Sequence, residues 1–433
     1  MHQVVIVGGG AGGLELATRL GDRLGRKQRA AIVLVDRNRT HVWKPLLHEV
    51  AAGSMDMHLH QLDYLAQARW HHFAFYYGAI EGLDRTQRTI SVSPINDEYG
   101  AEVIPRRTLP YDTLVLSIGS IANAFSVPGV AEYAFALDSA EEADRFHQRL
   151  INAVLRANYN PEAARRGLRV VIVGGGATGV ELAAELHNTT RVLAAYGLKN
   201  LDPERSVALT LLNADPRILP MLPERLARAT TAVLESLGVG VYCDEQVVEV
   251  SASEVRTKKG RVFPADLTVW AAGIKAPEVL RGLGSLETNR LNQLVVTPTL
   301  QTTLDPDIFA FGDCAACPWH GHRGTVPPRA QAAHQQAAHL ARTIERRLSG
   351  ESPEPWQYRD FGSLVSLGDY STIGSLMGFI SGPSFRVEGW FARLMYVSLY
   401  KLHLLALHGW WRVVVDSLAH TLRRGVDPRV KLH

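Results

Sequence analysis

Residues 4–17 read VVIVGGGAGGLELA and residues 170–183 read VVIVGGGATGVELA, so that two of fourteen positions differ. Each copy begins with four β-branched residues, which suit a parallel strand buried on both faces. Glycines follow in the pattern G-x-G-x-x-G, and an Ala/Leu/Glu-rich helical pattern comes next. The chain therefore contains an internal repeat of one unit, which consists of a strand, a turn and a helix.

The three glycines of this unit have different roles. The first permits a tight turn, the second lets the backbone approach a pyrophosphate, and the third lets the helix pack closely on the strand. The pyrophosphate then lies at a helix N-terminus, which favours negative charge. They are Gly8, Gly10 and Gly13 in the first copy and Gly174, Gly176 and Gly179 in the second. Any glycine-rich turn can match one such pattern, but two copies in the same context predict two dinucleotides with electron transfer between them.

The composition is that of an ordinary globular protein of about three domains, with 433 residues, 46% hydrophobic and 21% charged. The first strand begins at residue 4, which we interpret as leaving no room for a signal peptide, and three cysteines do not form a disulfide scaffold. Both features favour the cytoplasmic side of a cell. The basic excess lies in residues 386–433, where eight Lys or Arg outnumber three Asp or Glu. We expect no nucleic-acid partner.

The segment after the first glycine turn offers candidates for binding the first dinucleotide. AIVLVDR, residues 31–37, predicts a second strand that ends in Asp36, 23 residues past Gly13. A carboxylate at this spacing binds ribose hydroxyls, and an Asp that caps the next turn is the alternative. HVWKPLLHEVAAG, residues 41–53, has no cysteine, whereas flavin-dependent dithiol reductases carry a redox cysteine pair in this region. Lys44, Pro45 and His48 are candidate neighbours of the isoalloxazine, with a surface loop as the alternative.

The second unit departs from the first at the end of its next strand. LTLLNADPRILP, residues 209–220, has Asn213 where a ribose-binding carboxylate is expected. Asn does not repel a 2′-phosphate, so the choice between NADH and NADPH stays open. Glu181, on the first turn of the helix, is placed to orient a nicotinamide carboxamide or a flavin-side group; an acid stabilised by the helix dipole is the alternative. Gly273 lies in the glycine turn that closes this domain.

A later segment is predicted to return to the first domain, which makes the second domain an insertion. QTTLDPDIFAFGDCAACP, residues 301–318, gives a strand that ends at Gly312 and Asp313. An Asp that follows a glycine at a strand end suits hydrogen bonding to flavin ribityl or phosphate-side hydroxyls.

Two cysteines follow directly. The spacing of Cys314, Cys317, His320 and His322 is compatible with a metal site or a redox pair. Small buried cysteines in a turn are the simpler interpretation, and we predict no metal site.

Residues 326–348 predict a helix whose start is set by two prolines. Near its N-terminus, Gln331 and Gln335 share one face, among alanines such as Ala330 that let a planar ring approach. From these residues alone, an Ala-rich helix that serves only for packing is the alternative.

The C-terminal tail predicts two amphipathic helices, residues 390–408 and 410–424, separated by Gly409. No uncharged run there exceeds ten residues, whereas a bilayer span needs about 20. We therefore expect the helices to lie in the membrane interface, where basic residues with Trp and Tyr suit anionic headgroups. Helices that pack on the protein's own core, or on a second copy in a homodimer, are the alternative.

The whole chain resembles the type II NADH:quinone oxidoreductases, the single-subunit respiratory NADH dehydrogenases of bacteria. Several segments carry the resemblance in order along the chain: HVWKPLLHEVAAGSMD, VVIVGGGATGVELAAELHN, VWAAGIKAPEVL, FGDCAACP, VPPRAQAAHQQ and the basic helices that end in DPRVKLH. The resemblance implies FAD in the first unit, NADH as co-substrate at the second, and a membrane quinone, ubiquinone or menaquinone, as acceptor, without proton pumping.

The expected fold class is α/β, with two Rossmann-like dinucleotide-binding domains, the second inserted in the first, and a C-terminal region of small strands and amphipathic membrane-surface helices. Residues 1–120 and 290–350 are expected to form the FAD-binding domain, residues 121–289 the NADH-binding domain, and residues 351–433 the quinone-side and membrane-anchoring region. We expect a peripheral, monotopic protein on the cytoplasmic face of the inner membrane.

The resemblance also assigns residues. The family motif A-Q-x-A-x-Q, here residues 330–335, lies on the quinone side beside the flavin, and Glu181 matches a glutamate near the nicotinamide and quinone junction. Glu181, Gln331 and Gln335 are thus the expected catalytic residues. Asn213 departs from the family, where Glu is common, and this puts the nucleotide preference in doubt.

Three other functions are the alternatives to this one. A sulfide:quinone oxidoreductase needs a redox cysteine pair across the flavin, which Cys243 and the close pair Cys314 and Cys317 do not offer. A soluble ferredoxin or rubredoxin reductase would not need the amphipathic tail. A flavoprotein that binds NADH for redox signalling, with negligible turnover, is the alternative from another class.

Overall fold

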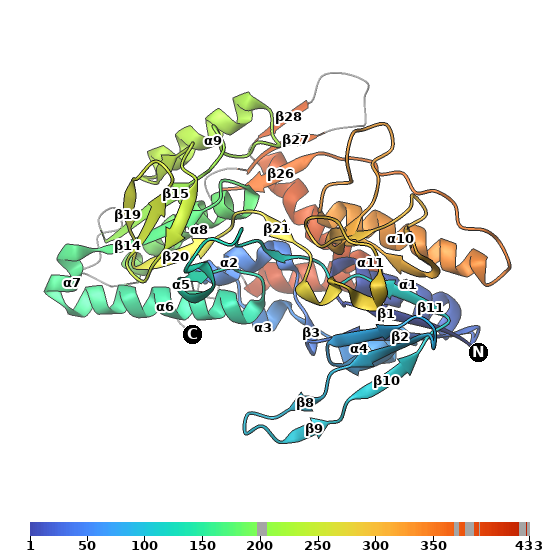
Figure 1. The fold of residues 1–433 in the computed structure, drawn as a ribbon. Helices are drawn as coiled ribbons and strands as arrows, with labels where there is room; N and C mark the ends of the chain where they lie inside the picture. Colours follow the sequence, from blue (N-terminus) through green and yellow to red (C-terminus); the bar gives the residue numbers. More distant parts are fainter. Residues whose placement is uncertain (197–205, 368–371, 377–384, 389, 424–429, 431–433) are drawn as a thin grey trace.

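The structure is a computed structural model that describes residues 1–433 except 197–205, 368–371, 377–384, 389, 424–429 and 431–433. It has two parallel sheets, each with helices packed against it, and a smaller C-terminal unit (Figure 1). The predicted α/β fold class is confirmed, including the insertion of the second sheet between strands of the first.

The first sheet contains the first copy of the repeat. Its order is β23-β24-β11-β1-β2-β5, and only the edge strand β23 pairs in the antiparallel sense. Its strands are β1 (His2–Val7), β2 (Ala30–Asp36), β5 (Ala74–Tyr77), β11 (Thr113–Leu116), β23 (Gln301–Thr302) and β24 (Asp305–Ala310). β1 is buried from Val4 to Val7, as expected for a central parallel strand. Two helices, α1 (Ala11–Leu20) and α10 (Ala330–Arg347), pack against each other over this sheet.

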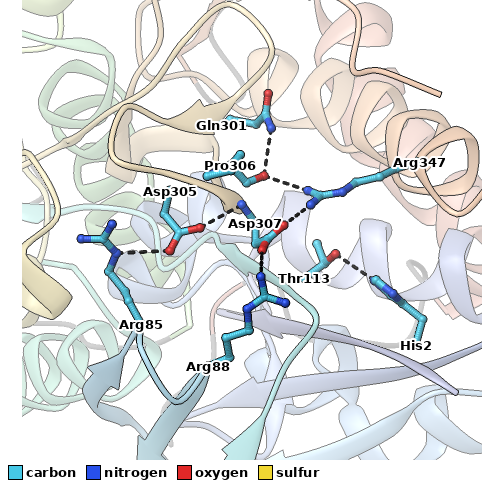
Figure 2. Close-up of polar contacts among 9 residues, drawn as sticks. All are labelled: His2, Arg85, Arg88, Thr113, Gln301, Asp305, Pro306, Asp307 and Arg347. Atoms are coloured by element: carbon cyan, nitrogen blue, oxygen red, sulfur yellow. Dashed lines mark hydrogen bonds and ion pairs between the residues drawn. The ribbon is translucent and has the colours of Figure 1, made fainter. Parts of the chain in front are cut away.

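The return of the chain to the first sheet is held by charged side chains at the start of β24. Arg85, in the turn between β6 (Ile80–Asp84) and β7 (Thr89–Val92), donates from Nε to Asp305 at 3.2 Å. Asp307 pairs with two arginines, Arg88 from the same turn and Arg347 from the end of α10 (Figure 2). These ion pairs join three segments that are distant in sequence.

The second sheet contains the second copy and is parallel throughout, in the order β13-β20-β14-β15-β16. Its strands are β13 (Ala134–Phe135), β14 (Leu168–Val173), β15 (Val207–Leu212), β16 (Gly240–Tyr242) and β20 (Leu267–Trp270). Its helices are α5 (Val130–Tyr133), α6 (Ala140–Tyr159), α7 (Pro161–Arg166), α8 (Ala177–Ala195) and α9 (Glu224–Ser236). β14 and β15 pair as β1 and β2 do, so the repeat extends to the topology.

Short strands and helices complete the two units. Smaller sheets are formed by β3 (Thr40–His41) with β4 (Leu62–Asp63), β6 and β7 with β10 (Arg107–Pro110), β8 (Ile95–Asn96) with β9 (Glu102–Ile104), β17 (Val247–Val250) with β18 (Glu254–Thr257) and β19 (Val262–Pro264), and β22 (Leu294–Val295) with β25 (Ala315–Ala316). The remaining short helices of the first unit are α2 (Leu47–Ala52), α3 (Met57–His60) and α4 (Tyr64–Trp70).

Two features join the sheets. β12 (Ile121–Ala122) comes shortly after β11, β21 (Ile274–Lys275) comes shortly after β20, and the two pair in the antiparallel sense. The ends of β11 and β20 therefore lie close together. In addition, α2 of the first unit packs on α6 and α8 of the second, and Thr189 donates a hydrogen bond from its hydroxyl to the Ala52 carbonyl at 2.8 Å.

The C-terminal unit contains the predicted small strands, β26 (Ser363–Ser366), β27 (Thr372–Leu376) and β28 (Phe385–Glu388), which form an antiparallel sheet. The tail forms α11 (Trp390–Arg423), which breaks at Gly409, where φ is 74°. The predicted break between two helices is thus confirmed. His403, in the part of this helix before Gly409, is buried in the protein. Among the described residues, no helix is both long and apolar enough to cross a membrane.

Candidate functional site

The first glycine turn has the geometry that the three predicted roles require. Gly8 adopts a φ of 101°, which favours glycine. A Cβ on Gly13 would lie 1.8 Å from the Gly8 carbonyl oxygen, so this glycine allows α1 to approach the turn. A Cβ on Gly10 would meet nothing within 4 Å, although Gly10 immediately precedes α1. The second glycine therefore faces open space at a helix N-terminus, where a pyrophosphate is stabilised.

The second glycine turn repeats these relations. Gly174 has a φ of 119°, and a Cβ on Gly179 would lie 2.0 Å from the Gly174 carbonyl oxygen. A Cβ on Gly176, which precedes α8, would again meet nothing within 4 Å. In both turns, no protein atom occupies the space next to the second glycine, so a phosphate group can approach the backbone there.

The residues at the ends of the second strands differ between the copies. Asp36 accepts hydrogen bonds from the Gly9 amide at 2.6 Å and the Asn38 amide at 2.7 Å. Burial raises the pKa of this carboxyl, and the two backbone hydrogen bonds act against that effect. A carboxylate has about four lone-pair positions, so Asp36 can still accept ribose hydroxyls.

Asn213 takes the corresponding place and accepts from the Gly175 amide at 3.1 Å. Its Nδ2 donates to the carbonyls of Asp215 at 3.1 Å and Arg217 at 2.8 Å. Both amide hydrogens are therefore used inside the protein, and one lone pair of Oδ1 is left for a ligand.

The remaining flavin-side candidates lie near the ends of β11 and β24, on the other side of β1 from Asp36. We call the region at these strand ends the first crevice, and the corresponding region of the second sheet the second crevice. Ser120 donates from its hydroxyl to Asp313 at 2.8 Å, and Lys44 donates from Nζ to the Ser120 carbonyl at 2.8 Å and to Asp138 at 3.0 Å. Burial raises the pKa of Asp313, while Ser120 and Lys44 act in the opposite direction. Gly312, with a φ of 72°, donates its amide to Gln336 at 2.9 Å.

Glu181 lies where the two units meet. It is buried on the first turns of α8, with a carboxylate oxygen 3.7 Å from Nδ1 of His48 on α2. Burial lowers the pKa of His48 to about 4. His48 is therefore neutral at physiological pH and lies in the interior, and the surface-loop alternative does not apply to it.

Gly273 follows β20, which lies on the other side of β14 from β15 and Asn213. Its φ is 71°, and it directly precedes β21. The Gly174 turn packs beside it, because a Cβ on Gly174 would lie 2.5 Å from the carbonyl carbon of Ala271. The glycine turn, Gly273 and the β12–β21 pair thus form one continuous edge.

α10 begins at Ala330 and presents a row of three polar side chains to the segment that leads to β26. Gln331 donates to the Gly362 carbonyl at 2.9 Å and accepts from the Phe361 amide at 3.2 Å. Gln335 donates to the Arg359 carbonyl at 2.8 Å and accepts from its amide at 3.1 Å. His339 continues the row with a contact of 3.0 Å to the Glu354 carbonyl. Both motif glutamines therefore hold this segment along α10.

Two histidines that were not predicted as site residues, His41 and His403 of α11, contact each other next to the first glycine turn. Nδ1 of His41 lies 3.0 Å from the Gly9 carbonyl, which can only accept, so Nδ1 donates. Nε2 of His41, 3.0 Å from Nε2 of His403, must then accept from it. Burial lowers the pKa of His41 to about 4 and that of His403 well below its usual value.

A contact between a glutamate and a histidine joins α1 to α10. Glu15 is fully buried, and its carboxylate lies 2.7 Å from Nδ1 of His334 and 2.7 Å from Arg19. Glu15 and Glu181 occupy the same position in the two copies of the repeat, which the sequence shows. Their partners differ, His334 and Arg19 for Glu15 and His48 for Glu181, and the sequence does not predict them.

Two of the three cysteines lie in the interior of the protein. Cys314 and Cys317 are buried, and burial raises the pKa of each thiol to about 12. Within the described part of the chain, no group of three or more His, Cys, Asp or Glu is placed to bind a metal ion.

Comparison with known proteins agrees with this geometry. Residues 2–337 match the pyridine nucleotide-disulphide oxidoreductase family. A type II NADH:quinone oxidoreductase of Haemophilus influenzae is 42% identical, with 100% of both chains covered. One from Mycobacterium tuberculosis is 27% identical over 93% of this chain and 84% of the relative.

Solved structures share the fold. NDH2 of Plasmodium falciparum, in complex with NADH, superposes with a TM-score of 0.83 at 16% identity, over 100% of this chain and 99% of that chain. The sulfide:quinone oxidoreductase of Aquifex aeolicus gives a TM-score of 0.72 at 18% identity, over 94% and 92% of the two chains. At such identities the likeness concerns the fold alone.

Proposed function

The chain belongs to the pyridine nucleotide-disulphide oxidoreductases and, among them, to the type II NADH:quinone oxidoreductases, and we propose how its residues divide that reaction. The enzyme oxidises NADH and reduces a quinone, with FAD as its cofactor. The observation that carries the proposal is the β12–β21 pair, since it brings the ends of β11 and β20, one from each dinucleotide fold, to the same place.

The first crevice fits FAD. Open space above Gly10 at the start of α1 suits the pyrophosphate, Asp36 suits the ribose, and the Gly312–Asp313 turn suits the flavin end. FAD, when bound, supplies the two-electron chemistry that links NADH oxidation to quinone reduction. We propose that residues 1–120 and 290–350 form this domain and that Lys44 lies beside the flavin ring.

The second crevice, in residues 121–289, fits NADH. The Gly176 turn suits its pyrophosphate, and the nicotinamide half then lies toward the end of β20, near Gly273. Glu181, buried beside neutral His48, is placed at the junction of the units to orient the nicotinamide. Asn213 holds the Gly175 turn and offers one acceptor position to the adenosine ribose.

The quinone side is proposed at the N-terminus of α10. Gln331 and Gln335 fix residues 359–362 along the helix, and this segment leads into residues 363–433, the C-terminal unit. The two glutamines therefore shape the acceptor site by positioning the segment beside it.

A half-reaction test distinguishes these roles. Under anaerobic conditions, NADH should bleach the flavin of the Gln331→Ala and Gln335→Ala variants at the wild-type rate, and reoxidation by quinone should slow by roughly tenfold or more. His339→Ala is the matched control, because it removes the third contact of the same row, further from the N-terminus of α10. Equal loss of both half-reactions, or an equal effect of His339→Ala, would refute the assignment.

The same assay tests the function itself. A wild-type protein that NADH does not bleach, or whose reduced flavin no quinone reoxidises, is not this enzyme. Sulfide in place of NADH should not bleach the flavin, because the thiols of Cys314 and Cys317 are buried and protonated.

We further propose that the second half of α11 lies on an anionic lipid surface. Five of its described apolar side chains are exposed, whereas Val413 in this half, and Leu404 and Leu407 before Gly409, are buried. The exposed fractions are 68% for Trp410, 63% for Trp411, 44% for Val414, 50% for Val415 and 62% for Leu418. Contiguous exposed apolar side chains with adjacent basic groups such as Arg412 suit a headgroup region.

Vesicle sedimentation tests this surface. The wild type should bind vesicles with anionic lipids more strongly than neutral ones, and Trp410→Ser with Trp411→Ser should weaken binding at least tenfold. Tyr99→Ser, in an exposed turn elsewhere, should leave binding unchanged. A double variant that still binds vesicles, but changes from dimer to monomer, would assign the patch to a second copy. The cytoplasmic face of the inner membrane is the location that we propose, since NADH is available there.

A further inference from the structure

One exposed aromatic side chain lies at the nicotinamide end of the second crevice. Phe125, in the link between β12 and α5, is 58% exposed. Its ring rests on Gly273, since a Cβ on that glycine would lie 2.7 Å from the ring carbon Cζ. No larger residue than glycine at 273 would leave the ring in this position.

The strand order determines which half of the dinucleotide passes there. In the order β13-β20-β14-β15-β16, the crevice opens between β14 and β20, where the order reverses. The adenosine ribose belongs to the end of the second strand, which here is β15 with Asn213. The dinucleotide therefore crosses the Gly174–Gly179 turn and places its nicotinamide half at the end of β20, beside Gly273 and Phe125.

The position of Phe125 is fixed by its surroundings. The Asn123 amide donates to the Gly273 carbonyl at 3.1 Å, and Trp270 donates from Nε1 to the Asn123 carbonyl at 2.8 Å. The Phe125 amide donates to Oδ1 of Asn123 at 3.0 Å. Phe125 and Ser126 have φ values of 49° and 58°. Such values are rare for bulky residues and persist where the surrounding structure imposes them.

We propose that Phe125 is a substrate-binding residue whose ring covers the nicotinamide half of NADH. This inference rests on the proposed function, because it takes NADH as the ligand of the second crevice. An aromatic ring held in place contributes contact area with little loss of conformational entropy on binding. Phe125 also lies five residues after Ser120, which contacts Asp313 at the flavin end. The same short segment thus touches both sites.

Equilibrium titration of the oxidised holoenzyme tests the proposal without turnover. For Phe125→Ala, the Kd of NAD⁺ should rise about tenfold, as stacking contacts of this size predict. The Kd of ADP, which lacks the nicotinamide half, should not change. ADP-ribose then locates the ring: an unchanged Kd places it over the nicotinamide, and a raised Kd places it over the adjoining ribose, and both results support the proposal.

Further variants separate the ring from the backbone strain. Phe125→Gly relieves the positive φ and should lose NAD⁺ affinity as Phe125→Ala does, whereas Phe125→Tyr should restore it. Tyr133→Ala, another exposed aromatic of the second unit, should bind NAD⁺ normally. Unchanged NAD⁺ affinity in Phe125→Ala, or equal weakening of ADP and NAD⁺, would overturn the inference. Failure of the wild type to be bleached by NADH would instead overturn the proposed function.

Discussion

The two dinucleotide turns have nearly the same sequence and differ in what holds them. In the first copy, the Gly9 carbonyl accepts from the side chains of His41 at 3.0 Å and Tyr64 at 2.7 Å. In the second, the Gly175 carbonyl accepts from the backbone amide of Leu219 at 2.7 Å. The first turn is thereby connected through His41 to His403 and α11, whereas the second is closed within its own domain. The two copies of the motif therefore differ in which parts of the protein hold the turn in place.

The same substitution in each copy should have the largest effect and should separate the two ligands. Gly13→Ala and Gly179→Ala each force a Cβ to within about 2 Å of a carbonyl oxygen, so the helix must shift from the turn. Gly13→Ala should purify with little flavin. Gly179→Ala should stay yellow and resist bleaching by NADH at concentrations that bleach the wild type, as visible absorbance will show.

Gly82→Ala, where the added Cβ meets only ordinary contacts at 3.7 Å, is the control for glycine substitution in general. Loss of flavin from Gly179→Ala would contradict the separate roles of the two copies.

Acid should weaken the contacts that hold the first turn. The pKa of His41 is lowered from 6.5 to about 4, so the folded state keeps the ring neutral where the unfolded chain is protonated. A depressed folded pKa gives stability that is present above pH 6.5 and is lost as pH falls toward 4. The loss amounts to at most about 3 kcal/mol for such a group. Calorimetry across this range should show it.

His403→Gln removes the other histidine of this pair, whose pKa burial also lowers, and leaves in place His48, whose pKa is lowered to about 4. His403 faces His41, His334 and His408, so removing its titration should flatten the decline below pH 6.5. An equally steep decline in the variant would place the acid-sensitive group elsewhere.

Asp36→Asn should convert the first ribose site toward the second. The carboxylate accepts from two backbone amides, and an amide side chain must turn one NH₂ group toward a donor. The Kd of FAD, measured by reconstituting the flavin-free protein, should rise about tenfold. The rate at which NADH bleaches the reconstituted variant should not change. A slower bleaching rate at full flavin occupancy would show that Asp36 serves more than flavin binding.

The sequence predicted those parts of the site that depend on local geometry. The glycine roles, the strand that ends in Asp36 and the returning strand before Asp313 follow from spacing within one segment, because turn and strand geometry fix them. The contacts of His41 with His403, and of Gln331 with residues 361–362, were not predicted. The first contact joins residues that are 362 positions apart in sequence, and the second joins residues that are 31 positions apart. Such pairs depend on how complete units pack.

Asn213 shows the limit of reading one position by analogy. In the sequence it was a residue that left the choice between NADH and NADPH open, because only its chemistry was visible. In the structure its amide closes the turn through Asp215 and Arg217, a use that a carboxylate at this position could not serve.

Asn213→Asp should therefore have the smallest effect and the most informative one. It places a carboxylate oxygen against two carbonyls, which should cost about 1–2 kcal/mol of unfolding free energy and lower the Tm by a few degrees. The added charge should also repel a 2′-phosphate, so kcat/KM for NADPH should fall more than that for NADH. Comparison of the two coenzymes in one assay measures this ratio, and thermal unfolding measures the cost. An unchanged ratio with a lowered Tm would mean that Asn213 acts only on the turn, and that the second copy selects its nucleotide without a side chain at this position.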